Sequence, residues 1–177
     1  MVVAFLPQGD SHIGSQNVSP IMNEDGSVHI MFKGPDNNTE ASIAYAKHWA
    51  GPYSLVAVNI FAPFYKQNMT NEDVWWWRSQ PDGYYHALSH RMDPANRRGP
   101  LCGGHAFSKD VSTGWRESLT PAYTTSVAAV GGAVAQAKAR ERPQLMFDSK
   151  TGKPSVLFNG VIREDGATFT FAQQLHA

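Results

Sequence analysis

Three polar residues stand at matching places along the chain, each just ahead of an apolar segment: Asn17, Asp73 and Glu141. Two of them are carboxylic acids, which can donate or accept a proton in general acid–base catalysis. The third is an amide, which can form hydrogen bonds but cannot abstract a proton. A fold that brought the three together would hold two carboxyl groups and one amide in a single site.

The segments that follow these residues share one pattern of strand, tight turn and strand. The three copies cover residues 20–34, 74–90 and 143–160. Each copy turns on a glycine, twice as Asp-Gly, and these residue types supply the positive φ angles that tight hairpins need. Weaker third strands follow the first two copies, at residues 43–46 and 105–108.

The repeats predict an all-β β-propeller with about three blades. We expect one domain over residues 1–177, divided into units of approximately 17–70, 71–120 and 121–177. The alanine-rich stretch Val127–Arg140 could form a helix, but Gly131-Gly132 in its middle would cost a helix roughly 1 kcal/mol per glycine. We therefore predict a hairpin that turns at the two glycines.

Composition narrows the classes of partner. Fifteen basic side chains balance fifteen acidic ones, so net charge gives no electrostatic case for binding nucleic acid or an anionic membrane. The single cysteine, Cys102, excludes an internal disulfide and is expected to be a bystander thiol. No signal peptide is seen at Met1–Pro7, and the compartment stays open, extracellular if the N-terminus is truncated.

Taken with their leading residues, the copies resemble the five-bladed β-propeller glycosidases, the superfamily of arabinanase, levansucrase, invertase and glycoside hydrolase family 43. The resemblance runs from about Asn17 to Val161. It rests on short motifs: Asn17-Val18-Ser19-Pro20, Glu72-Asp73-Val74-Trp75-Trp76-Trp77, Gly83-Tyr84-Tyr85-His86, Gly103-Gly104-His105-Ala106-Phe107-Ser108, Arg140-Glu141-Arg142-Pro143 and Leu157-Phe158-Asn159-Gly160-Val161. A complete member has five blades, so this chain reads as a fragment or an incomplete propeller.

The resemblance implies roles for the three polar residues. Glu141 matches the family's proton donor, which also precedes a proline by two positions, and Asp73 matches the aspartate that tunes this acid and contacts the sugar. If the first copy corresponds to the family's first blade, Asn17 stands at the position of the base. If an earlier blade is missing, the base aspartate is missing with it, and Asp10 is the candidate substitute. The alternatives stay open: an ordinary Arg-Glu-Arg surface cluster at Glu141, and a strand-start or turn aspartate at Asp73.

Strand alternation adds expectations about the neighbouring side chains. It places the arginines at 140 and 142 on the face opposite Glu141. It places Trp75 and Trp77 on one face and Trp76 on the other, where we favour packing between blades over sugar stacking. The expected sugar-binding residues are Asn17, Trp75, His90, His105 and Arg142, while His86 is expected to be an ordinary core or loop histidine.

The sequence thus predicts a carbohydrate-active propeller that hydrolyses glycosidic bonds in a polysaccharide or oligosaccharide, with Glu141 and Asp73 as its catalytic residues. A non-catalytic glycan-binding or interaction propeller is the alternative, and an incomplete product without independent function is the third reading. No cofactor and no zinc site is predicted, although a channel cation such as calcium stays open. The expected partner is carbohydrate, with self-association through open blade edges.

Overall fold

The computed structural model describes residues 17–33, 41–58, 60, 70–92, 103–128 and 131–175. Its strands are β1 Ser19–Met22, β2 Val28–Lys33, β3 Ala41–Ala46, β4 Ser54–Ala57, β5 Thr70–Arg78, β6 Tyr85–Met92, β7 Gly103–Ser108, β8 Arg116–Glu117, β9 Ser126–Ala128, β10 Val134–Gln136, β11 Ala139–Phe147, β12 Pro154–Ile162 and β13 Thr168–Gln174. All the pairings between them are antiparallel. Within these ranges no helix is long and apolar enough to cross a membrane.

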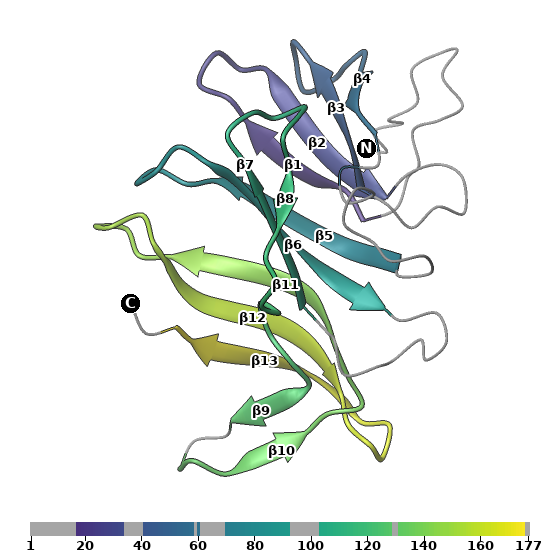
Figure 1. Cartoon of the computed structure of the whole chain (residues 1–177), viewed down its shortest axis with the longest axis vertical. Coiled ribbons are helices and arrows are strands. Elements are labelled where there is room, and N and C mark those ends of the chain that lie inside the picture. The colour runs from purple at the N-terminus through teal and green to yellow at the C-terminus, as the bar shows by residue number, and fades with distance from the viewer. Residues whose placement is uncertain are drawn as a thin grey trace.

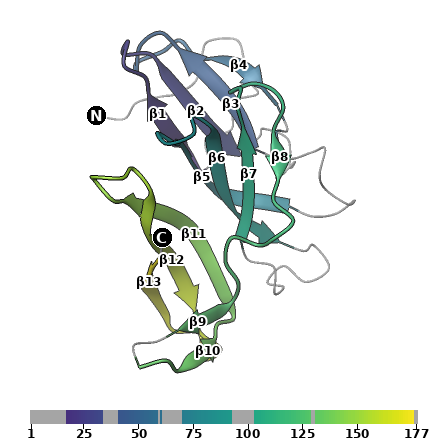
Figure 2. The ribbon, with the colours of Figure 1, turned by 60° about the vertical axis from the view of Figure 1, so that its left-hand side comes forward.

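Eleven of these strands form three sheets in chain order, here called sheet 1 (β1-β2-β3-β4), sheet 2 (β5-β6-β7-β8) and sheet 3 (β11-β12-β13). The small hairpin of β9 and β10 lies between sheets 2 and 3 in the sequence. Figures 1 and 2 show the sheets following one another along the length of the molecule. This arrangement confirms the all-β partial propeller.

The local pattern of the repeats appears as predicted. In sheet 1 the first turn places Gly26 at φ 83°, and the Asp25 carboxylate accepts the Ser27 backbone N–H at 2.9 Å. Such a short polar side chain folds the backbone back on itself and fixes the hairpin register. The glycines at 131 and 132 stand between β9 and β10, so the hairpin is confirmed over the alternative helix.

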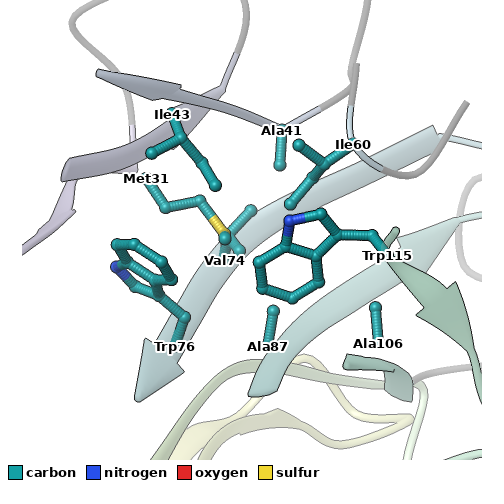
Figure 3. Close-up of a cluster of buried hydrophobic side chains, with 9 residues drawn as sticks. All are labelled: Met31, Ala41, Ile43, Ile60, Val74, Trp76, Ala87, Ala106 and Trp115. Carbon is teal, nitrogen blue, oxygen red and sulfur yellow. The ribbon is translucent and has the colours of Figure 1, made fainter. Parts of the chain in front are cut away.

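Sheets 1 and 2 are held together by a cluster of buried apolar side chains that both sheets contribute (Figure 3). Its buried members are Met31, Ala41, Ile43, Ile60, Val74, Trp76, Ala87, Ala106 and Trp115. Trp76 is 2% exposed, and its indole N–H donates to the Ser19 carbonyl at 2.7 Å. The indole therefore buries its large apolar surface with its one polar atom satisfied.

The three tryptophans divide as strand alternation predicts. The rings of Trp75 and Trp77 lie 5.3 Å apart, while Trp76 enters the cluster between sheets 1 and 2. Trp77 packs instead between sheets 2 and 3, beside Leu88 and Leu157. Trp76 and Trp77 thus fill the layers between sheets, and Trp75 stacks on Phe147 of sheet 3 at 5.9 Å.

Candidate functional site

The three sheets repeat one unusual backbone conformation. Asn17, Asp73 and Arg142 have φ angles of 56°, 53° and 51°, a region that residues other than glycine enter rarely. Asn17 lies two residues ahead of β1, and the other two interrupt β5 and β11, whose pairing shifts register between Glu72 and Trp75 and between Glu141 and Gln144. The repeat thus places a left-handed residue ahead of the first strand of sheet 1 and at a bulge within the first strands of sheets 2 and 3.

The shared positive φ gives a different alignment of the second and third copies from the one that the sequence indicated. The residue of sheet 3 that corresponds to Asp73 is Arg142, because both carry the positive φ. Glu141 then corresponds to Glu72, each one residue earlier. The sequence had matched Glu141 with Asp73 and missed Glu72, although a Glu-Asp pair at the head of the second copy was the available signal.

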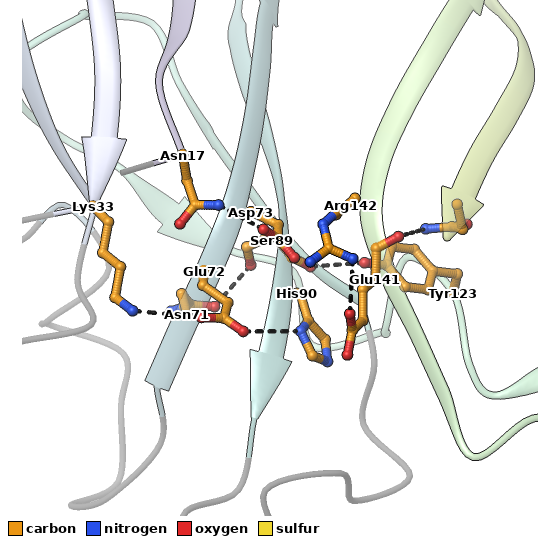
Figure 4. Close-up of polar contacts among 11 residues, drawn as sticks. Asn17, Lys33, Asn71, Glu72, Asp73, Ser89, His90, Tyr123, Glu141 and Arg142 are labelled. Atoms are coloured by element: carbon orange, nitrogen blue, oxygen red, sulfur yellow. Dashed lines mark hydrogen bonds and ion pairs between the residues drawn. The ribbon is translucent and has the colours of Figure 1, made fainter. Parts of the chain in front are cut away.

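The first strands converge on one pocket of about 400 Å³. It is lined by Asn17, Val18, Ser19, Pro20, Asp73, Val74, Trp75, Arg142, Pro143 and Gln144. Across it, the Asn17 amide N–H donates to Asp73 Oδ1 at 2.6 Å, a contact between sheets 1 and 2 (Figure 4). Residues 56 positions apart therefore meet at the place where the sequence expected the site.

The Asp73 carboxyl is tuned from several sides. Burial is the main cause that raises its pKa, and the negative charges of Glu72 and Glu141 raise it further. The positive charges of Arg142 and His90 oppose this shift. Charged groups of both sheet 2 and sheet 3 thus act on the Asp73 carboxyl.

Glu72 forms a second charged centre beside Asp73. Its Oε1 lies 3.7 Å from His90 Nδ1, and its Oε2 lies 3.4 Å from Lys33 Nζ of sheet 1. His90 is the main cause that lowers the pKa of Glu72, and Lys33 adds to the effect. Glu72 therefore stays ionised near neutral pH, held by one group from its own sheet and one from sheet 1.

A metal ion has one candidate cluster among the residues that the structure describes. Glu72, Asp73 and His90 offer ligand atoms that all lie within 4.8 Å of one another. Carboxylate oxygens and an imidazole nitrogen suit several divalent cations. The Lys33 ammonium already supplies positive charge to this group, so the predicted channel cation stays a prediction.

Glu141 sits beside the pocket with its carboxylate bound to a neighbour. Arg142 Nη1 donates to Glu141 Oε2 at 3.1 Å, and the Glu141 side chain is 16% exposed. The prediction that both flanking arginines point away from Glu141 is wrong for Arg142, because the positive φ at Arg142 breaks the alternation of the strand. Arg140 does lie on the other side, with only 2% of its surface exposed.

The histidines separate into two groups. His90 joins the polar cluster, whereas His105 lies beside His86, with their ring nitrogens 3.0 Å apart. Burial, with a smaller contribution from His86, lowers the pKa of His105 to about 4. Both rings stack on Trp77 in a separate pocket of about 360 Å³ between sheets 2 and 3. The structure therefore does not bring His105 to the pocket that holds Asp73.

Two residues of interest, Asp10 and Cys102, lie outside the described part of the chain. The proposal of Asp10 as a substitute base therefore stays a prediction.

No protein-family model matches this chain, and no curated protein does. Solved structures do match. An exo-β-1,3-galactanase of Clostridium thermocellum aligns with TM-score 0.60 and 11% identity over 89% of this chain and 36% of its own. A family 43 β-1,3-galactosidase solved with galactodeoxynojirimycin aligns with TM-score 0.61 and 9% identity over 93% of this chain and 58% of its own. A Bifidobacterium bifidum protein assigned as an exo-β-1,3-galactanase aligns with TM-score 0.56 and 7% identity over 89% and 48%.

The chain therefore spans between about a third and three fifths of the length of these proteins. TM-scores of 0.56 to 0.61 establish a shared fold, and identities of 7% to 11% leave the activity to be tested. The described sheets have the fold of a family 43-like propeller glycosidase, in the form of a partial propeller.

Proposed function

We propose that this chain is the site-bearing part of a carbohydrate-active propeller that hydrolyses glycosidic bonds. The observation that carries the proposal is one pocket shared by Asp73 of sheet 2 and Arg142 of sheet 3, because Arg142 in turn binds the Glu141 carboxylate. In this proposal Glu141 donates a proton to the departing sugar oxygen, and Asp73 tunes that donor and contacts the sugar. Trp75, His90 and Arg142 are proposed to bind sugar, since each lies in or beside this cluster.

Asn17 limits what these residues can do alone. Its amide donates to Asp73 and cannot accept a proton from water. The hydrolytic proposal therefore places the base in a part of the propeller outside these three sheets. His105, on the present geometry, is not proposed as a sugar ligand of this pocket.

The experiment is release of reducing sugar from a panel of β-1,3-galactan, arabinan, xylan and fructan. The galactan heads the panel because the three similar structures carry galactanase or galactosidase names. We expect Glu141→Gln to lower the rate by about 10²- to 10⁴-fold, the usual contribution of a positioned acid. Glutamine keeps an oxygen that can accept from Arg142, so the local fold should persist.

The matched control is Glu164→Gln, which makes the same chemical change at an exposed position of sheet 3's second turn. It should keep the wild-type rate. Equal rates for Glu141→Gln and the wild type would reject Glu141 as the acid. No turnover by a cooperatively folded protein that also contains the part of the propeller supplying the base would reject hydrolysis.

A non-catalytic glycan-binding propeller is the second candidate. It is favoured by the amide at Asn17, which is already committed to Asp73. Calorimetric binding of an oligosaccharide that persists in Glu141→Gln, without turnover by the wild type, would select this function.

A further inference from the structure

The guanidinium of Arg140 lies buried beneath the strand that carries Glu141. Its Nε donates to Asn159 Oδ1 at 2.8 Å, and its Nη2 donates to Gln173 Oε1 at 2.7 Å. Its Nη1 reaches the Thr124 carbonyl at 3.3 Å. One side chain thus ties β11 to β12, to β13 and to the segment that leads into β9.

Arg140 also dictates which way the Asn159 amide faces. A guanidinium can only donate hydrogen bonds, so the Asn159 oxygen must point toward it. The amide nitrogen is then left to face the other side, where it donates to the Glu141 backbone carbonyl at 3.2 Å. Asn159 is 1% exposed, so water does not compete for these positions.

The hydrogen bond from Asn159 to the Glu141 carbonyl lies where the regular pairing of β11 with β12 is interrupted. Glu141 pairs with Gly160 and Gln144 pairs with Phe158, so Asn159 stands opposite the bulge. The ladder is broken there, and Pro143 within the bulge has no N–H to offer. The Asn159 side chain therefore supplies a hydrogen bond to the Glu141 carbonyl where the regular backbone pairing is interrupted.

Sheet 2 has an equivalent pair of buried, hydrogen-bonded polar side chains at its own bulge. Ser89, which stands opposite Asp73 in the interrupted ladder, donates to Asn71 Oδ1 at 2.7 Å. Asn71 lies two residues before Asp73, as Arg140 lies two residues before Arg142. The same two positions thus carry a buried polar pair behind each bulged residue.

Tyr123 contacts both of these polar pairs. Its hydroxyl donates to the Ser89 carbonyl at 3.2 Å, and the Arg140 guanidinium carbon lies 5.0 Å from the centre of its ring. Its backbone is fixed as well, because Gly103 N–H donates to the Tyr123 carbonyl at 3.0 Å. One residue therefore contacts the supports of both bulges.

We infer that Arg140, Asn159 and Tyr123 form a positioning unit that sets Glu141 relative to Asp73. None of the three is placed in the pocket, so their effect on catalysis passes through the backbone of Glu141. The inference rests on the proposed function for its kinetic consequence. Its structural content, the hydrogen bond from Asn159 to the Glu141 carbonyl, stands apart from any activity.

The decisive variant is Asn159→Asp. A carboxylate still accepts from Arg140, as a charge-assisted pair that supports the fold, but it cannot donate to the Glu141 carbonyl and repels it. We expect a cooperative melt, a fall in kcat of about 10- to 100-fold and little change in KM, because small misplacements of a catalytic group act on the chemical step. The backbone ¹³C′ resonance of Glu141 should also move, since its hydrogen-bond donor is gone.

The matched control is Ser155→Ala, which removes another side chain-to-carbonyl bond between β12 and β11, at their far end. It should leave both kcat and the Glu141 resonance unchanged. Tyr123→Phe keeps the ring over Arg140 and loses the bond to Ser89, and we expect a smaller fall in kcat, on the order of 3- to 10-fold for one lost hydrogen bond.

Wild-type kcat together with an unmoved Glu141 resonance in Asn159→Asp would overturn the inference. If the wild type turns over no sugar, kcat offers no comparison and the resonance alone decides: movement supports the unit and no movement rejects it. If Asn159→Asp does not fold, Tyr123→Phe decides, and an unchanged kcat with an unmoved Glu141 resonance rejects the unit.

Discussion

At the scale of single residues, Asp73 combines a strained backbone with a carboxyl that is partly withdrawn from water. Its φ of 53° suits asparagine and aspartate better than most side chains. Burial raises its pKa, and its oxygen is held by the Asn17 amide. The positive φ and the partly buried carboxyl both lower the stability of the fold, as strained residues at functional sites often do.

We therefore expect Asp73→Asn to stabilise the protein at neutral pH. In the unfolded chain the carboxyl ionises near pH 3.8, whereas the folded protein holds its proton to higher pH. The stability linked to the protonated carboxyl is lost as pH rises between these two values, and asparagine carries no such loss. The asparagine oxygen can still accept from Asn17.

Thermal melts at pH 7 should show Asp73→Asn above the wild type, and in a domain this size each ~1 kcal/mol of added stability raises the melting temperature by about 2–4 °C. The gap should close toward pH 3, where both side chains are neutral. A lower melting temperature for the variant at pH 7 would show that the charge of Asp73 stabilises the fold.

At the scale of elements, the first residues of β7 must be small because the segment containing Tyr123 packs directly against them. A methyl group at Gly103 would lie 2.5 Å from a ring carbon of Tyr123 and 2.7 Å from its backbone nitrogen. A methyl group at Gly104 would collide with the Ser89 hydroxyl. The Gly-Gly pair thus allows the segment containing Tyr123 and the Ser89 side chain to pack closely against this strand.

Gly103→Ala should consequently lower the free energy of unfolding by ~1–3 kcal/mol, as overpacking does in tight sites. Gly160→Ala is the control, because its added methyl group would have its nearest neighbours at 3.8 and 3.9 Å, which is ordinary contact. Urea denaturation of the two variants measures the difference. Equal midpoints would mean that the Tyr123 segment moves aside without cost.

At the scale of the whole molecule, sheet 3 carries apolar side chains on both faces, and within the described residues it is sheet 2 that packs against one of them. Leu157 and Val161 of β12 are buried against sheet 2 and the β9–β10 hairpin. Strand alternation turns Val156 and Phe158 to the other face, where they are half-buried. A strand that is apolar on both faces is typical of a sheet packed on both sides.

We expect this second face of sheet 3 to drive weak, concentration-dependent self-association. Sedimentation velocity over a range of protein concentrations measures it. Phe158→Gln should reduce association while keeping a cooperative melt, because strand alternation turns this half-buried side chain away from sheet 2. Association that is equal in the variant would place the contact elsewhere, and a monomer at all concentrations would contradict the expectation.

The sequence by itself determined the architecture of this protein. Strand periodicity and the Asp-Gly turns act over a few residues, so the hairpins of sheets 1 and 2 and the turn at Gly131-Gly132 could be read directly. The division of Trp75, Trp76 and Trp77 between two faces followed from the same alternation. The convergence of Asn17 and Asp73 was also predictable, because equivalent points of neighbouring blades meet.

Only the tertiary structure decided how the site is put together. Positive φ angles at Asp73 and Arg142 break the alternation, so Arg142 turns toward Glu141 against expectation. The role of Glu72 depends on Lys33 of another sheet, which no local pattern reveals. Single bulges shift the side-chain register by one residue, and contacts between sheets join positions far apart in the chain. These two effects are non-local, which is why the sequence located the neighbourhood of Glu141 and the structure decided its partners.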